Sequence, residues 1–149
     1  MTRELLLLRH GKSDCSQNLD DFHRPLKNRG KRAAQRMGAW LARQQLVPDI
    51  VLASPAERAL VTAEKCCKAM GLRAQDVQLD SRLYEADLDA LLSLITDYLP
   101  EQGRLLLVGH NPGFEQLLCY LAGEPINALN DEKIMPTATL AQFVISREK

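Results

Sequence analysis

Residues 5–8 of the chain read LLLL, and this aliphatic run stops abruptly at Arg9, His10 and Gly11. A short apolar run bounded by a glycine predicts a strand buried on both faces, as in a parallel sheet covered by helices. Arg9, His10 and Gly11 would then lie at the carboxyl end of that strand. Ligands bind at this edge of open α/β sheets, so these three residues are the first candidates for a functional site.

Strand and helix patterns alternate along the rest of the chain. Short apolar runs predict strands within 48–55, 77–80, 103–113 and 138–146. Apolar residues at helical spacing predict helices over 27–45, 56–71, 88–100 and 114–124. This βαβα order predicts a single three-layer α/β/α domain over residues 1–149, with a mostly parallel sheet and right-handed crossovers.

The first predicted helix and the segment before it carry two further expectations. The helical spacing of Ala33, Met37, Trp40 and Leu41 predicts that they form the apolar stripe that packs on the core. Residues 14–26 are polar and rich in turn formers, and this loop is long enough to be functional rather than a simple connection.

The composition excludes several classes of function. Lys plus Arg and Asp plus Glu both number 19, so the zero formal net charge argues against a general nucleic-acid binder or a protein of anionic membranes. No apolar segment approaches the roughly 18 residues of a membrane span, and the N-terminal run is too short for a signal peptide. We therefore expect a cytoplasmic protein, and we also expect a monomer.

The four cysteines do not form a metal or disulfide pattern. No two of the cysteines have C-x-x-C spacing, and two of them are adjacent in a predicted helix. They are Cys15, Cys66, Cys67 and Cys119. This usage is typical of reduced, mostly buried thiols rather than of a zinc site.

A second histidine repeats the arrangement of His10. The aliphatic residues 105–108 lead to His110, which follows a glycine at the predicted end of its strand. The chain has only three histidines, and two of them occupy equivalent strand ends, which makes two isolated core histidines a poor explanation. The strand within 48–55 runs into SPAER, where Pro55 can begin a helix and Arg58 would lie near its amide-rich end.

Two guanidinium and two imidazole groups at one sheet edge suit the chemistry of a phosphoryl group. Arg9 and Arg58 can donate paired hydrogen bonds to phosphoryl oxygens, and arginines can stabilise the spread charge of a loose transition state. An imidazole can act as nucleophile and form a covalent phosphohistidine that water then hydrolyses. Gly11 would let the backbone approach the phosphate, and an amide of this turn could help to hold it.

Three motifs together carry a family resemblance. LRHGKS, SPAERALVTAE and VGHNPG resemble the histidine phosphatase superfamily in content and order, and they span nearly the whole chain. The stretch DFHRPLKNRGKRAAQRMGAWL is similar to the SixA-like phosphohistidine phosphatase branch. The resemblance implies a phosphoglycerate-mutase-like fold and a phosphorylated nucleophile at His10. It also implies that Arg9, Arg58 and His110 bind the phosphoryl group and that no metal or other cofactor is needed.

Three more residues complete the expected site. Arg24, in HRPL, matches a feature of that branch and could contact substrate, although a structural role explains an exposed loop arginine equally well. Asn111 beside His110 is expected to bind substrate. The position of a general acid in mutase-like members corresponds to Glu85, although the acidic start of the following helix explains this residue equally well. His23 is expected to be a surface residue.

Three functions remain open from the sequence. The first is a phosphatase that acts on a phosphohistidine of a signalling or phosphocarrier protein, such as a histidine-phosphotransfer domain. The short chain favours this reading because it offers no long insertion that could close over a small metabolite. The second is a phosphatase of small phosphoesters or other phosphorylated metabolites, and the third is an inactive phosphate-binding module.

Overall fold

The computed structural model describes residues 2–123 and 139–146 of the chain. Its regular elements are β1 (Thr2–Arg9), α1 (Asn28–Arg43), β2 (Ile50–Ala53), α2 (Glu57–Ala69), β3 (Val77–Leu79), α3 (Leu88–Tyr98), β4 (Gly103–Gly109), α4 (Gly113–Ala122) and β5 (Leu140–Ser146). Two short 3-10 helices, η1 (Ala74–Asp76) and η2 (Ser81–Leu83), flank β3. Every predicted helix and strand is present. Residue 124, the predicted end of one helix, and residue 138, the predicted start of the last strand, lie outside the described residues.

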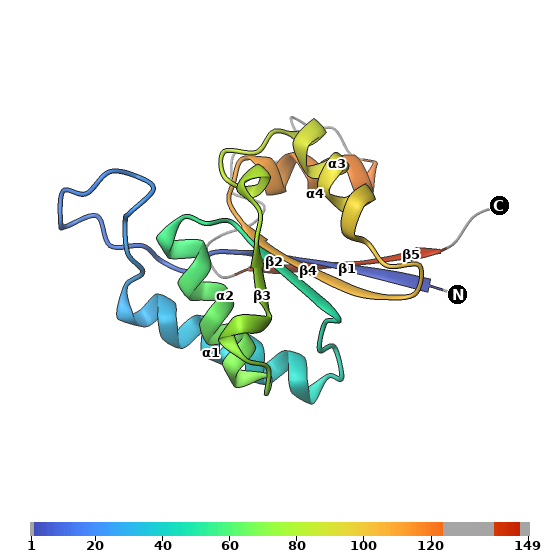
Figure 1. The fold of residues 1–149 in the computed structure, drawn as a ribbon, viewed down its shortest axis with the longest axis horizontal. Coiled ribbons are helices and arrows are strands. Elements are labelled where there is room, and N and C mark those ends of the chain that lie inside the picture. The colour runs from blue at the N-terminus through green and yellow to red at the C-terminus, as the bar shows by residue number, and fades with distance from the viewer. Residues whose placement is uncertain (1, 124–138, 147–149) are drawn as a thin grey trace.

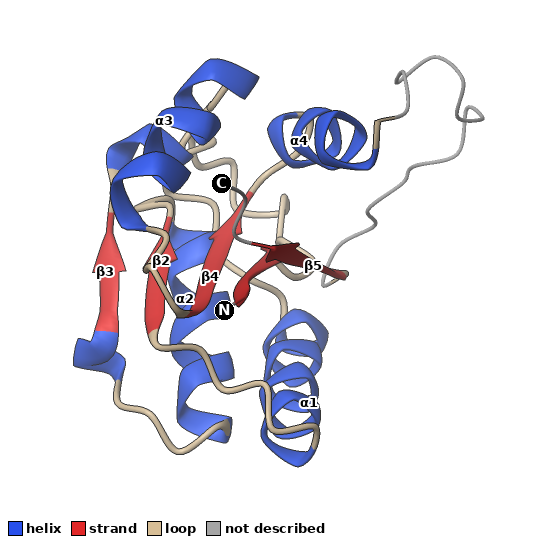
Figure 2. Ribbon diagram, turned by 90° about the vertical axis from the view of Figure 1, so that its right-hand side faces the viewer, coloured by secondary structure: helices blue, strands red, loops and turns tan. Residues whose placement is uncertain are grey.

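The sheet has the strand order β3-β2-β4-β1-β5. The first four strands run parallel, and β5 pairs antiparallel with β1 at the edge. Helices α1 and α2 cover one face of this sheet, and α3 and α4 cover the other (Figures 1 and 2). The prediction of one three-layer α/β/α domain with a mostly parallel sheet is confirmed.

The leucines of β1 divide the core into two halves. Leu6 and Leu8 pack in a cluster with Leu41 of α1 and buried apolar residues of α2, whereas Leu5 and Leu7 pack in the cluster of α3 and α4. All four side chains are fully buried. Each buried leucine contributes roughly 1.5–3 kcal/mol of transfer free energy, so this strand is fixed at the centre of the domain.

The core-facing side of α1 differs from the predicted stripe. Its buried residues are Gly30, Ala34, Gly38 and Leu41, whereas Trp40 is 40% exposed. A Cβ atom at Gly38 would lie 2.2 Å from the carbonyl oxygen of Cys66, so the glycine permits the close approach of α1 to α2. The expectation of a core Trp40 was therefore wrong, because a count of apolar side chains gives no weight to glycines on a packed face.

The cysteines agree with the sequence analysis. Cys66, Cys67 and Cys119 are buried, and Cys15 is exposed. Burial raises the pKa of the Cys66 thiol to about 12, so this thiol stays protonated near neutral pH. Across residues 2–123 and 139–146, none of the helices combines the length and apolar character needed to traverse a bilayer.

Candidate active site

The parallel pairing of β1 and β4 brings two histidines together. Arg9 at the end of β1 is in register with Gly109 at the end of β4, and the amide of His10 donates to the Gly109 carbonyl at 3.0 Å. The imidazole rings of His10 and His110 follow these two positions, and their centroids lie 5.1 Å apart. Two segments that are far apart in the sequence therefore place one histidine each at the same edge of the sheet.

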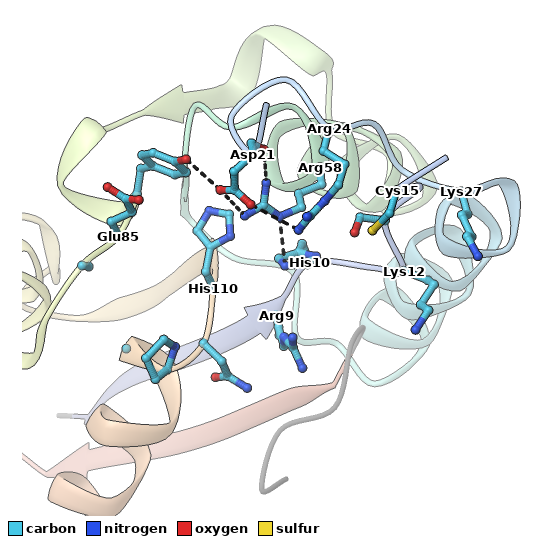
Figure 3. A pocket seen from close by; sticks show the side chains of 16 residues that line it. Arg9, His10, Lys12, Cys15, Asp21, Arg24, Lys27, Arg58, Glu85 and His110 are labelled. Atoms are coloured by element: carbon cyan, nitrogen blue, oxygen red, sulfur yellow. Dashed lines mark hydrogen bonds and ion pairs between the residues drawn. The ribbon is translucent and has the colours of Figure 1, made fainter. Parts of the chain in front are cut away.

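A pocket of about 800 Å³ lies over these strand ends (Figure 3). Most of the residues expected from the sequence are part of its wall, namely Arg9, His10, Arg24, Arg58, Glu85, His110 and Asn111. Arg58 is the second residue of α2, which begins at Glu57, one residue after the predicted start of this helix. His23 is exposed and pairs with Asp20, as expected for a surface residue.

The hydrogen bonds of His10 fix the position of its proton. The Nε of Arg58 lies 3.3 Å from Nε2 of His10, and since arginine only donates, Nε2 carries a lone pair. Nδ1 lies 2.7 Å from the Gly11 carbonyl and therefore carries the proton. Burial, assisted by the positive charges of Arg58 and Arg9, lowers the pKa of His10 to about 4. The imidazole is therefore neutral near pH 7, with Nε2 as its basic atom.

His110 is also a neutral imidazole. Burial lowers its pKa to about 3, and the neighbouring His10 and Arg58 add to the effect. Its Nε2 lies 2.7 Å from the Oγ of Ser54, which accepts a hydrogen bond from the Ala56 amide. Among the described residues, Nδ1 of His110 is buried without a hydrogen-bond partner. A Ser54 hydroxyl that donates to Nε2 leaves the proton of His110 on Nδ1.

Asp21 is a site residue that the sequence analysis missed. Its carboxylate accepts hydrogen bonds from Arg58 at 3.0 Å and from the hydroxyl of Tyr84 at 2.7 Å, and it forms an ion pair with Arg24 at 3.2 Å. These donors hold the pKa of Asp21 below its usual range against the opposing effect of burial. The only sequence signal was an acidic residue three positions before Arg24 in a loop of expected function.

The loop of residues 14–26 is anchored on the start of α2. The amide of Glu57 donates to the Phe22 carbonyl at 3.0 Å, and NH1 of Arg58 donates to the Asp21 carbonyl at 2.6 Å. The ring of Tyr84 stacks edge-on against Phe22 at 5.1 Å and lies 5.7 Å from the ring of His110. The hydrogen bond to Asp21 raises the pKa of Tyr84 to about 12, so its hydroxyl stays a donor.

Gly11 is in contact with two other segments of the chain. Its amide donates to the Thr62 hydroxyl at 3.0 Å instead of facing the pocket, and Gly11 is not part of the pocket wall. A Cβ atom at Gly11 would lie 2.9 Å from the carbonyl oxygen of Gly30. The glycine therefore lets the chain after β1 pack directly on the first turn of α1. The expected contact of Gly11 with a phosphoryl group stays a prediction.

Glu85 is separate from the start of α3. Asp87 caps that helix by accepting from the Ala90 amide at 2.9 Å, and Asp89 lies in its first turn. Glu85 precedes the cap, lies in the pocket wall and has a φ of 55°. A left-handed backbone at a non-glycine residue costs on the order of 1–3 kcal/mol, and such strain is concentrated at functional sites. Helix capping therefore explains the two aspartates but does not explain Glu85.

The sequence matches the model of one protein family. The family model of the histidine phosphatase superfamily (branch 1) matches residues 5–97, which is more than half of the chain. The chain belongs to this superfamily. An uncharacterized protein of Mycobacterium tuberculosis is 34% identical over 115 residues, covering 77% of this chain and 70% of the relative. A chloroplast protein of Arabidopsis thaliana is 28% identical, and the chain spans 62% of its length.

Solved structures give the same picture of the fold. The SixA protein of Agrobacterium tumefaciens, assigned as a phosphohistidine phosphatase, aligns with a TM-score of 0.81 and 31% identity over 94% of this chain and 90% of its own. A protein histidine phosphatase SixA complexed with tungstate aligns with a TM-score of 0.75 and 23% identity over 93% of this chain and 86% of its own. These superfamily members have the phosphoglycerate-mutase-like fold expected from the sequence.

Proposed function

We propose that this protein is a phosphohistidine phosphatase that removes the phosphoryl group from a histidine of another protein. The observation that carries the proposal is the neutral His10 imidazole, whose basic Nε2 faces a pocket lined by guanidinium groups. The fold similarity to SixA proteins supports phosphatase activity and favours this substrate class.

The first step transfers the phosphoryl group to His10. Nε2 attacks phosphorus, the new N–P bond forms, and the bond to the substrate nitrogen breaks with its electron pair on the leaving imidazole. The Arg58 contact to Nε2, at 3.3 Å, is longer than an ordinary hydrogen bond and can be exchanged for one to a phosphoryl oxygen. The nucleophile is thus released as the substrate is bound.

Positive groups around His10 stabilise the transferred phosphoryl group. Arg9 and Arg58 approach from two different elements, and His110 can donate from Nδ1. Such preorganised donors act on the charge that spreads over the equatorial oxygens in a loose transition state. In the second step water attacks phosphorus, and the His10 N–P bond breaks with its electron pair on Nε2. The protons of the water leave with the released phosphate, so the neutral imidazole is restored.

The choice of a protein substrate rests on the leaving group and on the pocket rim. A phosphoramidate can leave as neutral imidazole with less help from an acid than an alkoxide requires. The pocket wall includes the exposed residues Lys12, Cys15 and Glu85, so part of its rim lies at the protein surface. A side chain presented by a partner protein can reach His10 from that surface.

A phosphatase of small phosphoesters is the second candidate. The observation in its favour is Glu85, a carboxyl group in the pocket wall on a constrained backbone, since a phosphoester leaving group needs a proton. A 2,3-bisphosphoglycerate-dependent phosphoglycerate mutase of Bifidobacterium longum is 37% identical over 94 residues, although the chain covers only 38% of that enzyme. The family therefore includes relatives with small phosphorylated substrates.

One set of assays separates the candidates. The kcat/KM of the protein is measured on phosphorylated histidine-phosphotransfer domains, phosphocarrier proteins and phosphomonoesters, and rapid quench with labelled substrate tests for acid-labile, base-stable phosphate on the enzyme. We expect the highest kcat/KM on a phosphohistidine protein, and labelled wild-type enzyme. His10→Ala removes turnover and label, whereas His23→Ala, at an exposed histidine outside the pocket, keeps both. Phosphate binding without any turnover would instead identify an inactive binding module.

A further inference from the structure

Lys12 and Lys27 form a pair at one end of the pocket. The Lys27 amide donates to the Lys12 carbonyl at 2.8 Å, and the Asp14 amide donates to the Pro25 carbonyl at 2.7 Å. These bonds enclose the antiparallel bridge between Ser13 and Leu26. Lys12 and Lys27 are therefore opposite each other at the neck of the 14–26 loop. Both line the pocket that contains His10.

The backbone around this pair is tightly constrained. A Cβ atom at Gly30 would lie 2.6 Å from the Lys12 carbonyl oxygen, so the segment after β1 is packed against the first turn of α1. The Lys27 residue directly precedes that helix. Backbone hydrogen bonds and backbone packing therefore hold the two lysines near each other, although their side chains carry like charges.

Two lysines opposite each other are unfavourable without a negative group. Like charges at directly opposed positions of an antiparallel pair are destabilising. Within residues 2–123 and 139–146, neither ammonium group is in an ion pair, and the first turn of α1 has no acidic residue. The nearby Asp14 carboxylate is bonded to Ser16, which is the main cause of its lowered pKa, and Lys27 adds only a small effect.

The pocket offers room for a second anion at this end. Figure 3 shows Lys12 and Lys27 on the side of His10 that is opposite to Glu85. The cavity of about 800 Å³ is far larger than a phosphoryl group. A substrate whose phosphoryl group reaches His10 therefore extends over other parts of the wall. One of these parts carries the two lysines, neither of which is in an ion pair among the described residues.

We propose that Lys12 and Lys27 form a second anion subsite, which binds a carboxylate or phosphate that flanks the transferred phosphoryl group. This inference rests on the proposed phosphatase function and adds a specificity determinant to it. The anion can be an acidic side chain next to a phosphohistidine of a protein, or an acid group of a small phosphorylated metabolite. In both cases the two lysines discriminate between substrates by charge.

The test compares matched pairs of substrates. One pair is a phosphohistidine peptide with flanking Glu and the same peptide with flanking Gln. The other pair is carboxyphenyl phosphate and phenyl phosphate. We expect the acidic member of at least one pair to have a kcat/KM about three- to tenfold higher, mainly through KM, as is typical of partly exposed ion pairs. The preference should shrink as ionic strength rises.

The variants assign the preference to the lysine pair. The double substitution Lys12→Gln with Lys27→Gln should bring the acidic-to-neutral ratio to about one. Lys65→Gln with Lys68→Gln removes the same charge from α2, at positions distant from its pocket-forming start, and should keep the wild-type ratio. A preference confined to the peptides assigns the anion to a protein, and one confined to the aryl phosphates assigns it to a metabolite.

The outcomes separate the subsite from the proposed function. The subsite would be overturned if the wild type had equal kcat/KM for the acidic and the neutral member of both pairs. It would also be overturned if the double variant kept the wild-type ratio of these two values. Turnover of aryl phosphates without turnover of any peptide would contradict the proposed function. In that case the comparison of carboxyphenyl phosphate with phenyl phosphate still tests the subsite. Where nothing is turned over, dissociation constants for the same four compounds, measured by calorimetry, give the ratio directly.

Discussion

Arg58 and Asp21 are bound to each other twice. NH2 of the guanidinium donates to Oδ2 of the carboxylate at 3.0 Å, and NH1 donates to the Asp21 carbonyl at 2.6 Å. The Arg58 side chain is only 7% exposed, so an uncompensated charge there would be costly. Asp21 supplies that compensation and leaves the Nε of Arg58 directed at His10. A loop residue thus sets the orientation of the arginine that contacts the nucleophile.

The Asp21→Asn substitution separates the charge of this residue from its hydrogen bonds. The amide oxygen can still accept from Arg58 and Tyr84, but the negative charge near the phosphoryl position is gone. We expect vanadate, an analogue of the phosphoryl transition state, to bind about three- to tenfold more tightly, since one unfavourable charge contributes on the order of 1 kcal/mol. The Asp21→Ala variant loses the hydrogen bonds as well, and its kcat should fall by about tenfold or more. Weaker vanadate inhibition of Asp21→Asn would contradict this account.

The pH dependence of stability follows from the two neutral histidines. Burial lowers the pKa from the ordinary value of 6.5 to about 4 for His10 and to about 3 for His110. Between pH 6.5 and 4 the unfolded chain binds protons at these positions that the folded chain does not. The free energy of unfolding therefore falls as the pH is lowered through this window, by up to about 1.4 kcal/mol per pH unit for each histidine.

Urea denaturation at pH 7, 6, 5 and 4.5 measures this dependence. His10→Asn should show a slope that is smaller by up to about 1.4 kcal/mol per pH unit, because one of the two linked groups is removed. Nitrogen NMR of the wild-type imidazole should show the proton on Nδ1 of His10 across the same range. A His10 ring that is protonated at pH 6 would contradict the neutral nucleophile.

Several features of the site could be predicted because they depend on the strand pattern alone. The aliphatic runs before His10 and His110 are buried strands, and parallel strands in register place the residues after them side by side. Arg58 followed from the same logic, because it lies in the first turn of the helix after β2. Each of these positions is determined by local sequence together with one topological rule.

The features that the sequence did not predict depend on contacts between distant segments. Asp21 reaches the site only through its bonds to Arg58 and Tyr84, and a polar loop has no periodicity from which to predict that. The packing of Gly11 on Gly30 could not be predicted, because Gly30 belongs to another element. Trp40 was assigned to the core from its helical spacing. The packing of α1 on α2 at Gly38, which turns a different side of α1 to the core, depends on contacts between two helices.

Metal independence is a further prediction from the charge of the site. In the proposed mechanism, Arg9 and Arg58 supply the positive field that a divalent cation supplies in other phosphoryl-transfer enzymes. Treatment with a chelator should leave kcat/KM unchanged within about twofold, and added magnesium should not raise it. A preparation that loses its activity in chelator and regains it with magnesium would show that the arginines alone are insufficient.

The role of Glu85 decides between the two phosphatase candidates. Its carboxyl group lies in the pocket wall, but a phosphohistidine substrate needs little help from an acid. For that substrate we expect Glu85→Gln to lower kcat by less than about tenfold, well below the ~10²–10⁴ of a working general acid. Arg58→Ala should cost far more, because it removes a proposed donor to the phosphoryl group and one of the hydrogen-bond partners of Asp21.

A phosphomonoester substrate would reverse this order. Glu85→Gln would then approach Arg58→Ala in severity, and the basic limb of the pH profile would disappear with the carboxyl group. Both variants are measured on both substrate types, with circular dichroism and thermal unfolding as checks of the fold. Glutamine keeps the shape of the side chain at the left-handed backbone position of residue 85, so a difference in kcat reports the proton and not the backbone. A large loss on phosphohistidine in a folded Glu85→Gln protein would assign a general acid to the site and favour the small-phosphoester function.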